Sequence, residues 1–260
     1  TWAFKLRFAG LVANITPDIQ SVINACKELK NGKKLHKFLA VVLTIGNFLN
    51  GQNKRKVTHG FKLKSLAKLN DTKSSDGKTS LLQFIATFIA EKYPEANGFY
   101  EELGSIKPSS RVLVGALQDD IKTCKEGLAA VKKHIELREK NSLPEDKYIE
   151  IMRPFYEKGM ESLVKLDEKM EEMLIALKET GQLFDEPEQD MLKEPDKFFQ
   201  SVDSFITLYM QADQKNQQAK EMEEKKKKQE EAKLRQEQLR LEKQNQLLAK
   251  ATEKKTTGGG

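Results

Sequence analysis

The sequence predicts an elongated all-α protein with a compact globular part, an antiparallel coiled-coil-like hairpin and an extended, charged C-terminal helix. Apolar residues recur at intervals of three and four through most of the 260 residues, as in helices with one buried face. Glycine (15) and proline (7) are scarce, which disfavours a chain of many short strands and turns. Charged residues make up 32% of the chain, so much of the helical surface is expected to lie in water.

The first 50 residues are predicted to form two or three packed helices. One stripe has spacings of four, three and four: Phe4, Phe8, Leu11 and Ile15. Thr16 is suited to cap a second helix and Pro17 to begin it, and Asn31-Gly32 to end it. That helix would carry inward Ile19, Val22, Ile23, Cys26 and Leu29. The run from Leu35 to Leu49 is apolar nearly all round, which predicts a helix buried at the centre of the domain.

A basic stretch follows the turn at Asn50-Gly51. Residues 54–78 hold two aspartates, Asp71 and Asp76, against eight basic residues: Lys54, Arg55, Lys56, Lys62, Lys64, Lys68, Lys73 and Lys78. Such a patch attracts an anionic partner, which leaves nucleic acid, anionic lipid and an acidic protein face open. A solvated loop with ordinary lysines is the simpler alternative. The segment from Thr79 to Glu91 is predicted to be a helix, with caps offered by polar residues of 71–76 and a stop at Pro94.

Two apolar seams predict the hairpin. The first alternates spacings of four and three through Leu117, Ile121, Cys124, Leu128, Val131 and Ile135. The second alternates three and four through Leu163, Leu166, Met170, Met173 and Leu177. A period of 3.5 residues is that of a coiled coil, and the polar break at 141–144 is short enough to join antiparallel neighbours. The hairpin is therefore predicted to be a rod that sets the distance between sites.

The C-terminal part divides into an amphipathic helix and a charged tail. The helix is expected to return to a core with Phe198, Phe199, Val202, Phe205, Ile206 and Tyr209. From about residue 213 no continuous apolar stripe remains, so we expect one domain over 1–212 and a helical tail over 213–260, partly disordered at its end. Glutamates precede basic residues by four positions, as in Glu223 and Lys227, which supports a solvated helix that frays before Thr256.

No pattern predicts a catalytic, metal or cofactor site. His36, His59 and His134 lack Cys or His neighbours at metal-ligand spacing, and Cys26 and Cys124 lie on apolar helix faces as inert core thiols. Phosphate-binding loops, nucleophile elbows and metalloprotease motifs do not occur, so we expect no enzyme. No stretch approaches the roughly 20 apolar residues of a membrane span. With two cysteines and no signal peptide, a reducing, cytoplasmic setting is expected.

Several motifs in order resemble the formin homology 2 domain of diaphanous-type formins. They are Gly46-Asn47-Phe48-Leu49-Asn50, then Gly60-Phe61-Lys62-Leu63, then Asp71-Thr72-Lys73-Ser74. The spacing matches the family's pattern, and Tyr93-Pro94-Glu95, Ser110-Arg111-Val112 and Phe198-Phe199 are similar as well. The resemblance covers residues 1 to about 212.

The resemblance implies an actin-binding protein that nucleates filaments and elongates them processively at the barbed end, as a cytoplasmic part of the actin cytoskeleton. Family members form head-to-tail dimers in which a lasso of one protomer wraps a post of the other. By this resemblance the lasso-receiving surface comprises Gly46, Asn47, Phe48, Asn50, Gly60 and Phe61. Lys73 matches the family's actin-contacting lysine, and its basic neighbours are assigned with it: Lys62, Lys64 and Lys68.

The residues themselves agree with part of this assignment. Gly46 allows close approach of another chain, and Asn47 and Asn50 share one helix face, where their amides can bind a visiting backbone. Phe48 alone is more typical of a core position.

The sequence departs from the family at its start. The lasso and the first part of the actin-binding knob are expected before Thr1, so the chain as given is expected to be largely monomeric. Trp2 is the only tryptophan and does not suit a lasso position. Two alternatives stay open: a helical scaffold or adaptor, and a basic module that binds nucleic acid or a membrane surface. The four lysines at 225–228 fit the latter, although glutamates surround them.

Overall fold

The computed structural model describes residues 1–51, 58–75, 77–141 and 146–256, with side chains up to residue 241. The chain divides into two units, Thr1–Met210 and Gln211–Gly260. The elements, in order, are α1 (Trp2–Asn31), α2 (Lys33–Gly51), η1 (Leu63–Ser65), α3 (Lys68–Asp71), α4 (Leu81–Lys92), η2 (Pro94–Ala96), η3 (Phe99–Glu102), α5 (Ile106–Ser109), α6 (Val114–Lys140), α7 (Tyr148–Phe184), α8 (Glu188–Lys193) and α9 (Pro195–Thr256). The described residues contain no strand beyond one isolated bridge, which confirms the all-α class.

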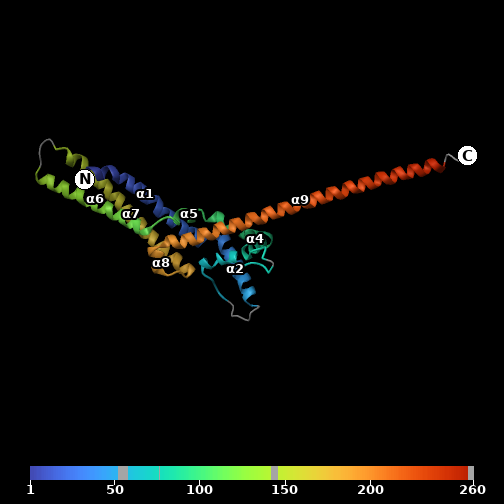
Figure 1. The fold of residues 1–260 in the computed structure, drawn as a ribbon. Coiled ribbons are helices and arrows are strands. Elements are labelled where there is room, and N and C mark those ends of the chain that lie inside the picture. The colour runs from blue at the N-terminus through green and yellow to red at the C-terminus, as the bar shows by residue number, and fades with distance from the viewer. Residues whose placement is uncertain (52–57, 76, 142–145, 257–260) are drawn as a thin grey trace. The chain divides into compact units, whose positions relative to one another are not determined.

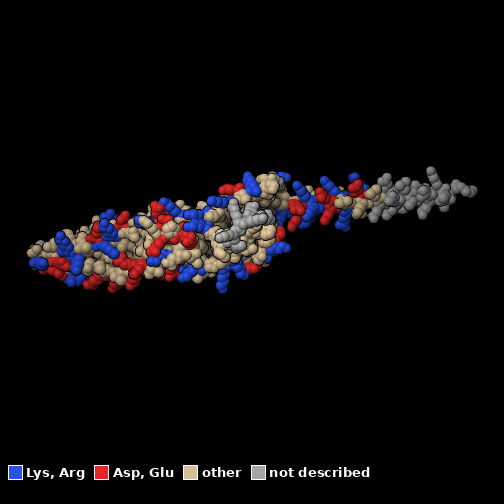
Figure 2. Space-filling view, turned by 90° about the horizontal axis from the view of Figure 1, so that it is seen from below, with Lys and Arg blue, Asp and Glu red and all other residues tan. Residues whose placement is uncertain are grey.

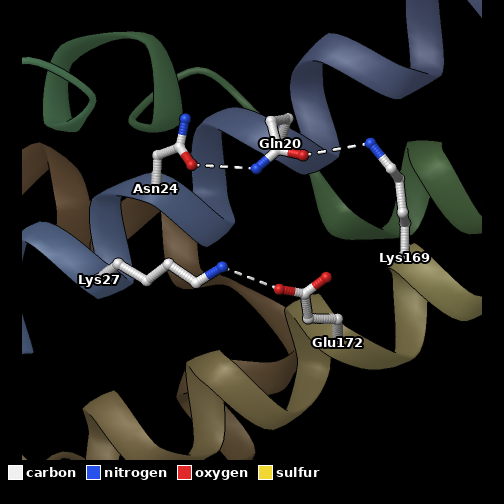
Figure 3. A network of polar contacts seen from close by, with 5 residues as sticks. All are labelled: Gln20, Asn24, Lys27, Lys169 and Glu172. Carbon is white, nitrogen blue, oxygen red and sulfur yellow. Dashed lines mark hydrogen bonds and ion pairs between the residues drawn. The ribbon is translucent and has the colours of Figure 1, made fainter.

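Helices α1, α6 and α7 pack along one another as a bundle (Figure 1). Every residue of the two predicted seams is buried, which confirms the hairpin of α6 and α7. The prediction missed that α1 is its third member. Polar contacts align α1 with α7: Lys27 Nζ lies 2.9 Å from Glu172 Oε1, and Lys169 Nζ donates to Gln20 Oε1 at 3.1 Å (Figure 3). The break expected at 141–144 falls mostly outside the described residues.

The predicted boundary at Thr16 and Pro17 is wrong, because α1 runs through it without a break. Thr16 Oγ1 donates to the carbonyl of Val12 at 2.8 Å, a bond to the preceding turn rather than a cap. Pro17 has no N–H to donate to the helix. Tertiary packing compensates, since Phe8 and Ile19, on either side of the proline, are both buried. The helix therefore continues because one core receives both of its halves.

Two glycines of the bundle make a matched test of its packing. An ideal Cβ at Gly127 of α6 would lie 2.2 Å from Cε2 of Phe4, whereas one at Gly10 of α1 meets nothing within 4 Å. We expect Gly127→Ala to lower the free energy of unfolding by about 1–3 kcal/mol through overpacking. Gly10→Ala should raise it by up to about 1 kcal/mol through helix propensity. Urea unfolding measures both, and a stabilised Gly127→Ala variant would contradict the packing.

The compact part closes around four aromatic rings from distant segments. Phe38 of α2 lies 4.2 Å from Phe99 of η3 between ring centroids, and 5.2 Å from Tyr209 of α9. Phe205 completes the cluster at 6.0 Å from Phe99. All four side chains are buried, so the predicted return of the amphipathic helix to a core is confirmed.

The cysteines lie in the core as expected. Cys26 and Cys124 are both free and buried. Burial raises the pKa of the Cys26 thiol to about 11, against a smaller opposing effect of its hydrogen bond with Thr180. The thiol therefore stays protonated at neutral pH and is a poor nucleophile.

The second unit continues α9 as a polar helix whose side chains, from residue 217 to 241, are exposed. Glu223 Oε1 lies 2.8 Å from Lys227 Nζ, and this hydrogen bond lowers the pKa of Glu223 and raises that of Lys227. The helix reaches Thr256, so the expected fraying before that residue is wrong. The disorder expected at the end concerns 257–260, which lie outside the described residues. None of the described helices is long and apolar enough to cross a membrane.

Candidate docking surface on α2, α3 and α4

Five of the six residues predicted to receive the lasso line one cavity of about 280 Å³: Gly46, Asn47, Asn50, Gly60 and Phe61. Its apolar lining comes from α2, from α4 and from the chain between them, and includes the buried residues Val42, Leu66 and Ile85. The motif residues therefore converge in space although 15 positions of sequence separate Gly46 from Phe61.

The sixth residue, Phe48, lies outside that cavity lining and is 68% exposed, so its expected core position is wrong. The expectation that α2 is buried all round is wrong for the same reason. Its buried residues, Leu35, Phe38 and Val42, all lie in the first ten positions, whereas Leu49 is exposed. The second half of α2 extends beyond the aromatic core and presents its apolar residues to solvent, as at protein interaction sites.

Asn47 is already engaged within the chain. Its side-chain amide donates to the carbonyl of Thr58 at 2.8 Å, and its Oδ1 accepts from the amide of Thr58 at 2.9 Å. The Asn47 side chain thus pairs with both backbone groups of Thr58, as a neighbouring strand residue would, and holds the start of the segment 58–61. Asn47 thus shapes the cavity, while among the described residues Asn50 shows no side-chain hydrogen bond and keeps its amide available.

We expect Asn47→Ala to speed hydrogen exchange at the Thr58 amide by about 2- to 10-fold, since a net hydrogen bond contributes about 0.5–1.5 kcal/mol. Asn50→Ala is the matched control, because it removes a cavity amide but no observed bond. Residue-resolved exchange by NMR measures both. Equal exchange rates in the two variants would contradict the role given to Asn47.

A second cavity, of about 640 Å³, shares Gly60 and Phe61 with the first. Its other walls come from α2 and from the end of α7, with Leu183 and Phe184. The sequence contains no sign that Leu183 and Phe184 lie near Phe61, because the segment from Gly181 to Pro187 indicates only the end of a helix. Phe61 therefore lines both cavities, together with Leu43 and Gly60.

Lys73 lies in a narrow turn that connects α3 to α4. It forms the isolated antiparallel bridge with Ser80, next to which the amide of Leu81 donates to the carbonyl of Thr72 at 2.7 Å. The backbone at Lys73 is thereby fixed, and its side chain is exposed. A lysine held in this way offers a point charge at a defined place to an acidic partner.

The start of α4 differs from the expected cap. Ser80, rather than a residue of 71–76, caps the helix: its Oγ accepts from the amide of Gln83 at 3.2 Å, and Gln83 Oε1 accepts from the amide of Ser80 at 2.9 Å. This capping box was readable as Ser followed three positions later by Gln. Asp76 lies outside the described residues.

The structure separates the other basic residues into two groups. Lys62 Nζ donates to the carbonyl of Asp185 at 3.1 Å, and Lys64 lines a cavity with Glu186 and Asp190. Lys62 Nζ also lies 3.7 Å from Asp185 Oδ2, so both lysines lie beside carboxylates of their own chain. Lys64 is exposed all the same, as is Lys68 on α3. The cluster members Lys54, Arg55 and Lys56 lie outside the described residues. On the face seen in Figure 2, blue and red residues mingle over the body of the molecule.

No group of His, Cys, Asp or Glu able to hold a metal ion occurs in the described part of the chain. The arrangement instead offers two apolar cavities, a free amide and exposed lysines, which are means of binding a protein partner.

Comparisons with known proteins identify the family. The family described as Formin Homology 2 Domain matches residues 1–210. Human "Protein diaphanous homolog 3" is 35% identical over 82% of this chain and 18% of its own length. The Xenopus laevis "Disheveled-associated activator of morphogenesis 1-A" is 31% identical over 82% and 20%, and the Drosophila melanogaster "Protein diaphanous" is 30% identical over 84% and 20%. The chain thus spans about a fifth of the length of these relatives. Through residues 1–210, the chain belongs to the formin homology 2 family.

Proposed function

We propose that this chain is the actin-binding core of a formin that nucleates filaments and elongates them processively at the barbed end. Family membership over residues 1–210 supports the proposal, and the observation that carries it is Lys73, exposed on a fixed turn. Lys68 is assigned to the same contact, and Lys62 and Lys64 flank it. Because the contact is ionic, actin binding should weaken as salt concentration rises.

The cavity lined by Gly46, Asn47, Asn50, Gly60 and Phe61 is proposed to receive the lasso of a second protomer. Its apolar walls suit an aromatic side chain, and the amide of Asn50 suits a passing backbone. Phe48, exposed nearby on α2, adds contact area. We assign this domain to residues 1–212 and the tail to 213–260, next to the observed division between residues 210 and 211. The proposed role is non-catalytic, in the cytoplasmic actin cytoskeleton.

The test is actin assembly with a complete formin homology 2 domain that contains this chain. We expect faster assembly from monomers, and single-filament microscopy should show the protein moving with growing barbed ends. A scaffold or adaptor would leave assembly unchanged. A basic nucleic-acid or membrane binder would instead bind duplex DNA or anionic vesicles with a steep salt dependence. Either of these results would overturn the proposal.

A further inference from the structure

Helices α1 and α2 meet at an elbow of one residue, Gly32. Its amide donates to the carbonyl of Glu28 at 2.8 Å, and its carbonyl accepts from the amide of His36 at 3.0 Å. An ideal Cβ at Gly32 would lie 2.9 Å from the Glu28 carbonyl oxygen and 3.3 Å from Glu102 Oε2. The elbow thus has no room for a side chain. It joins the bundle, through α1, to the helix that carries the receiving surface.

The segment from Phe99 to Ser105 bonds to the helices on both sides of this elbow, and each bond involves a carboxylate. Glu102 of η3 accepts from the backbone amide of Lys34 at 3.0 Å, in the first turn of α2. Glu28 of α1 accepts from the amide of Ser105 at 2.8 Å and from its hydroxyl at 2.6 Å. Glu102 therefore ties the bridging segment to α2, and Glu28 ties α1 to the same segment.

These bonds are suited to fix the direction of the α2 axis as well as to add stability. The first amides of a helix lack intrahelical acceptors, so a carboxylate that binds one of them caps the helix from outside. The negative charge also interacts favourably with the helix dipole. Since the donor at Lys34 is backbone, the bond constrains the axis of α2 itself. Glu101 offers the contrast, because it pairs with the mobile Nζ of Lys34 at 3.2 Å.

We propose that Glu102 and Glu28 are positioning residues that hold α2 at a fixed angle to the bundle and so place the receiving surface and Lys73. The part of this proposal that concerns binding of actin and of a second protomer rests on the proposed function, whereas the fixed angle of α2 does not. Neither carboxylate touches the cavities or Lys73, so their effect on assembly would pass through the direction of α2.

The angle can be measured in this chain with spin labels at two exposed positions, Thr44→Cys on α2 and Ala130→Cys on α6. The native cysteines are buried, and a mock reaction without the new cysteines checks that they stay unlabelled. We expect a narrow distance distribution for the parent and a broadened or shifted one for Glu102→Ala. Glu102→Gln keeps an acceptor oxygen and should restore the parent distribution. Glu101→Ala, which removes a neighbouring carboxylate from the same Lys34, should leave it unchanged.

Circular dichroism must first show that the variants are folded. If Glu102→Ala is not, Ser105→Ala takes its place, since it removes one of the two bonds to Glu28. A parent-like distribution for the folded variant would overturn the proposal, as would an equal change in Glu101→Ala. In the complete domain, Glu102→Ala should slow actin assembly by about 2- to 10-fold, the effect of one net hydrogen bond, and Glu102→Gln should restore it. A changed distance with unchanged assembly would overturn the positioning role, whereas an inactive parent domain would overturn the proposed function alone.

Discussion

Replacing Lys73 by aspartate in a complete formin homology 2 domain is expected to lower the rate of actin assembly by at least about tenfold, because like charges brought together at an interface cost several kcal/mol. The lysine lies in a turn that its bridge to Ser80 holds in place, so its charge cannot easily be supplied from another position. Fluorescence of labelled actin, followed over a range of protein concentrations, measures the change.

The matched control for this prediction is Lys107→Asp on α5, which makes the same charge change at another exposed lysine. It should retain nearly the full rate. Higher salt should lower the parent's rate and narrow the difference between the parent and Lys73→Asp, since exposed charges are screened. An equal loss in both variants would point to net charge rather than to a contact at Lys73, and unchanged assembly in Lys73→Asp would remove the assignment of this residue.

Replacing Phe99 by alanine is expected to lower the free energy of unfolding of the first unit by about 3–5 kcal/mol, the usual cost of removing a large buried aromatic side chain. Phe99 has no exposed surface and its ring contacts Phe38, Phe205 and Tyr209. The cavity left by its removal would lie between α2, η3 and α9, which cannot close around it without shifting. Urea unfolding followed by tryptophan fluorescence and circular dichroism measures the loss.

Phe84→Ala provides the comparison, since that ring is 52% exposed on α4. It should cost less than about 1 kcal/mol, because the alanine leaves no enclosed cavity. A similar cost for both residues would show that the aromatic cluster is not the centre of the compact part. If only the fluorescence transition of Trp2 shifted to lower urea, the destabilised part would be the bundle, where Trp2 contacts Tyr148 of α7.

The hairpin of α6 and α7 could be predicted from the sequence because its packing is local and periodic. Leu117 to Ile135 and Leu163 to Leu177 repeat apolar residues every three or four positions, and a helix turns this repeat into one buried stripe. The third helix could not be assigned in the same way. A stripe on α1 shows that a partner exists, yet nothing in its spacing says which helix supplies it.

The candidate site was predictable as a set of residues but not as a shape. The motifs identified Gly46, Asn47, Asn50, Gly60 and Phe61, and the structure places these around one cavity. The exposure of Phe48 could not be predicted, because burial depends on how far α2 extends past its core. The second cavity depends on Leu183 and Phe184, more than 120 positions away, and contacts of that range leave no periodic signal.

The aromatic cluster also has a consequence for how the chain is made. Phe38 finds Tyr209 only after roughly 170 further residues have been synthesised, which takes on the order of ten to thirty seconds on a ribosome. During that interval the apolar face of α2 lacks its cover from α9. Phe99 is synthesised earlier, but the cluster also needs Phe205 and Tyr209 of α9. We therefore expect the nascent chain to stay open to chaperones and to misassociation until α9 emerges.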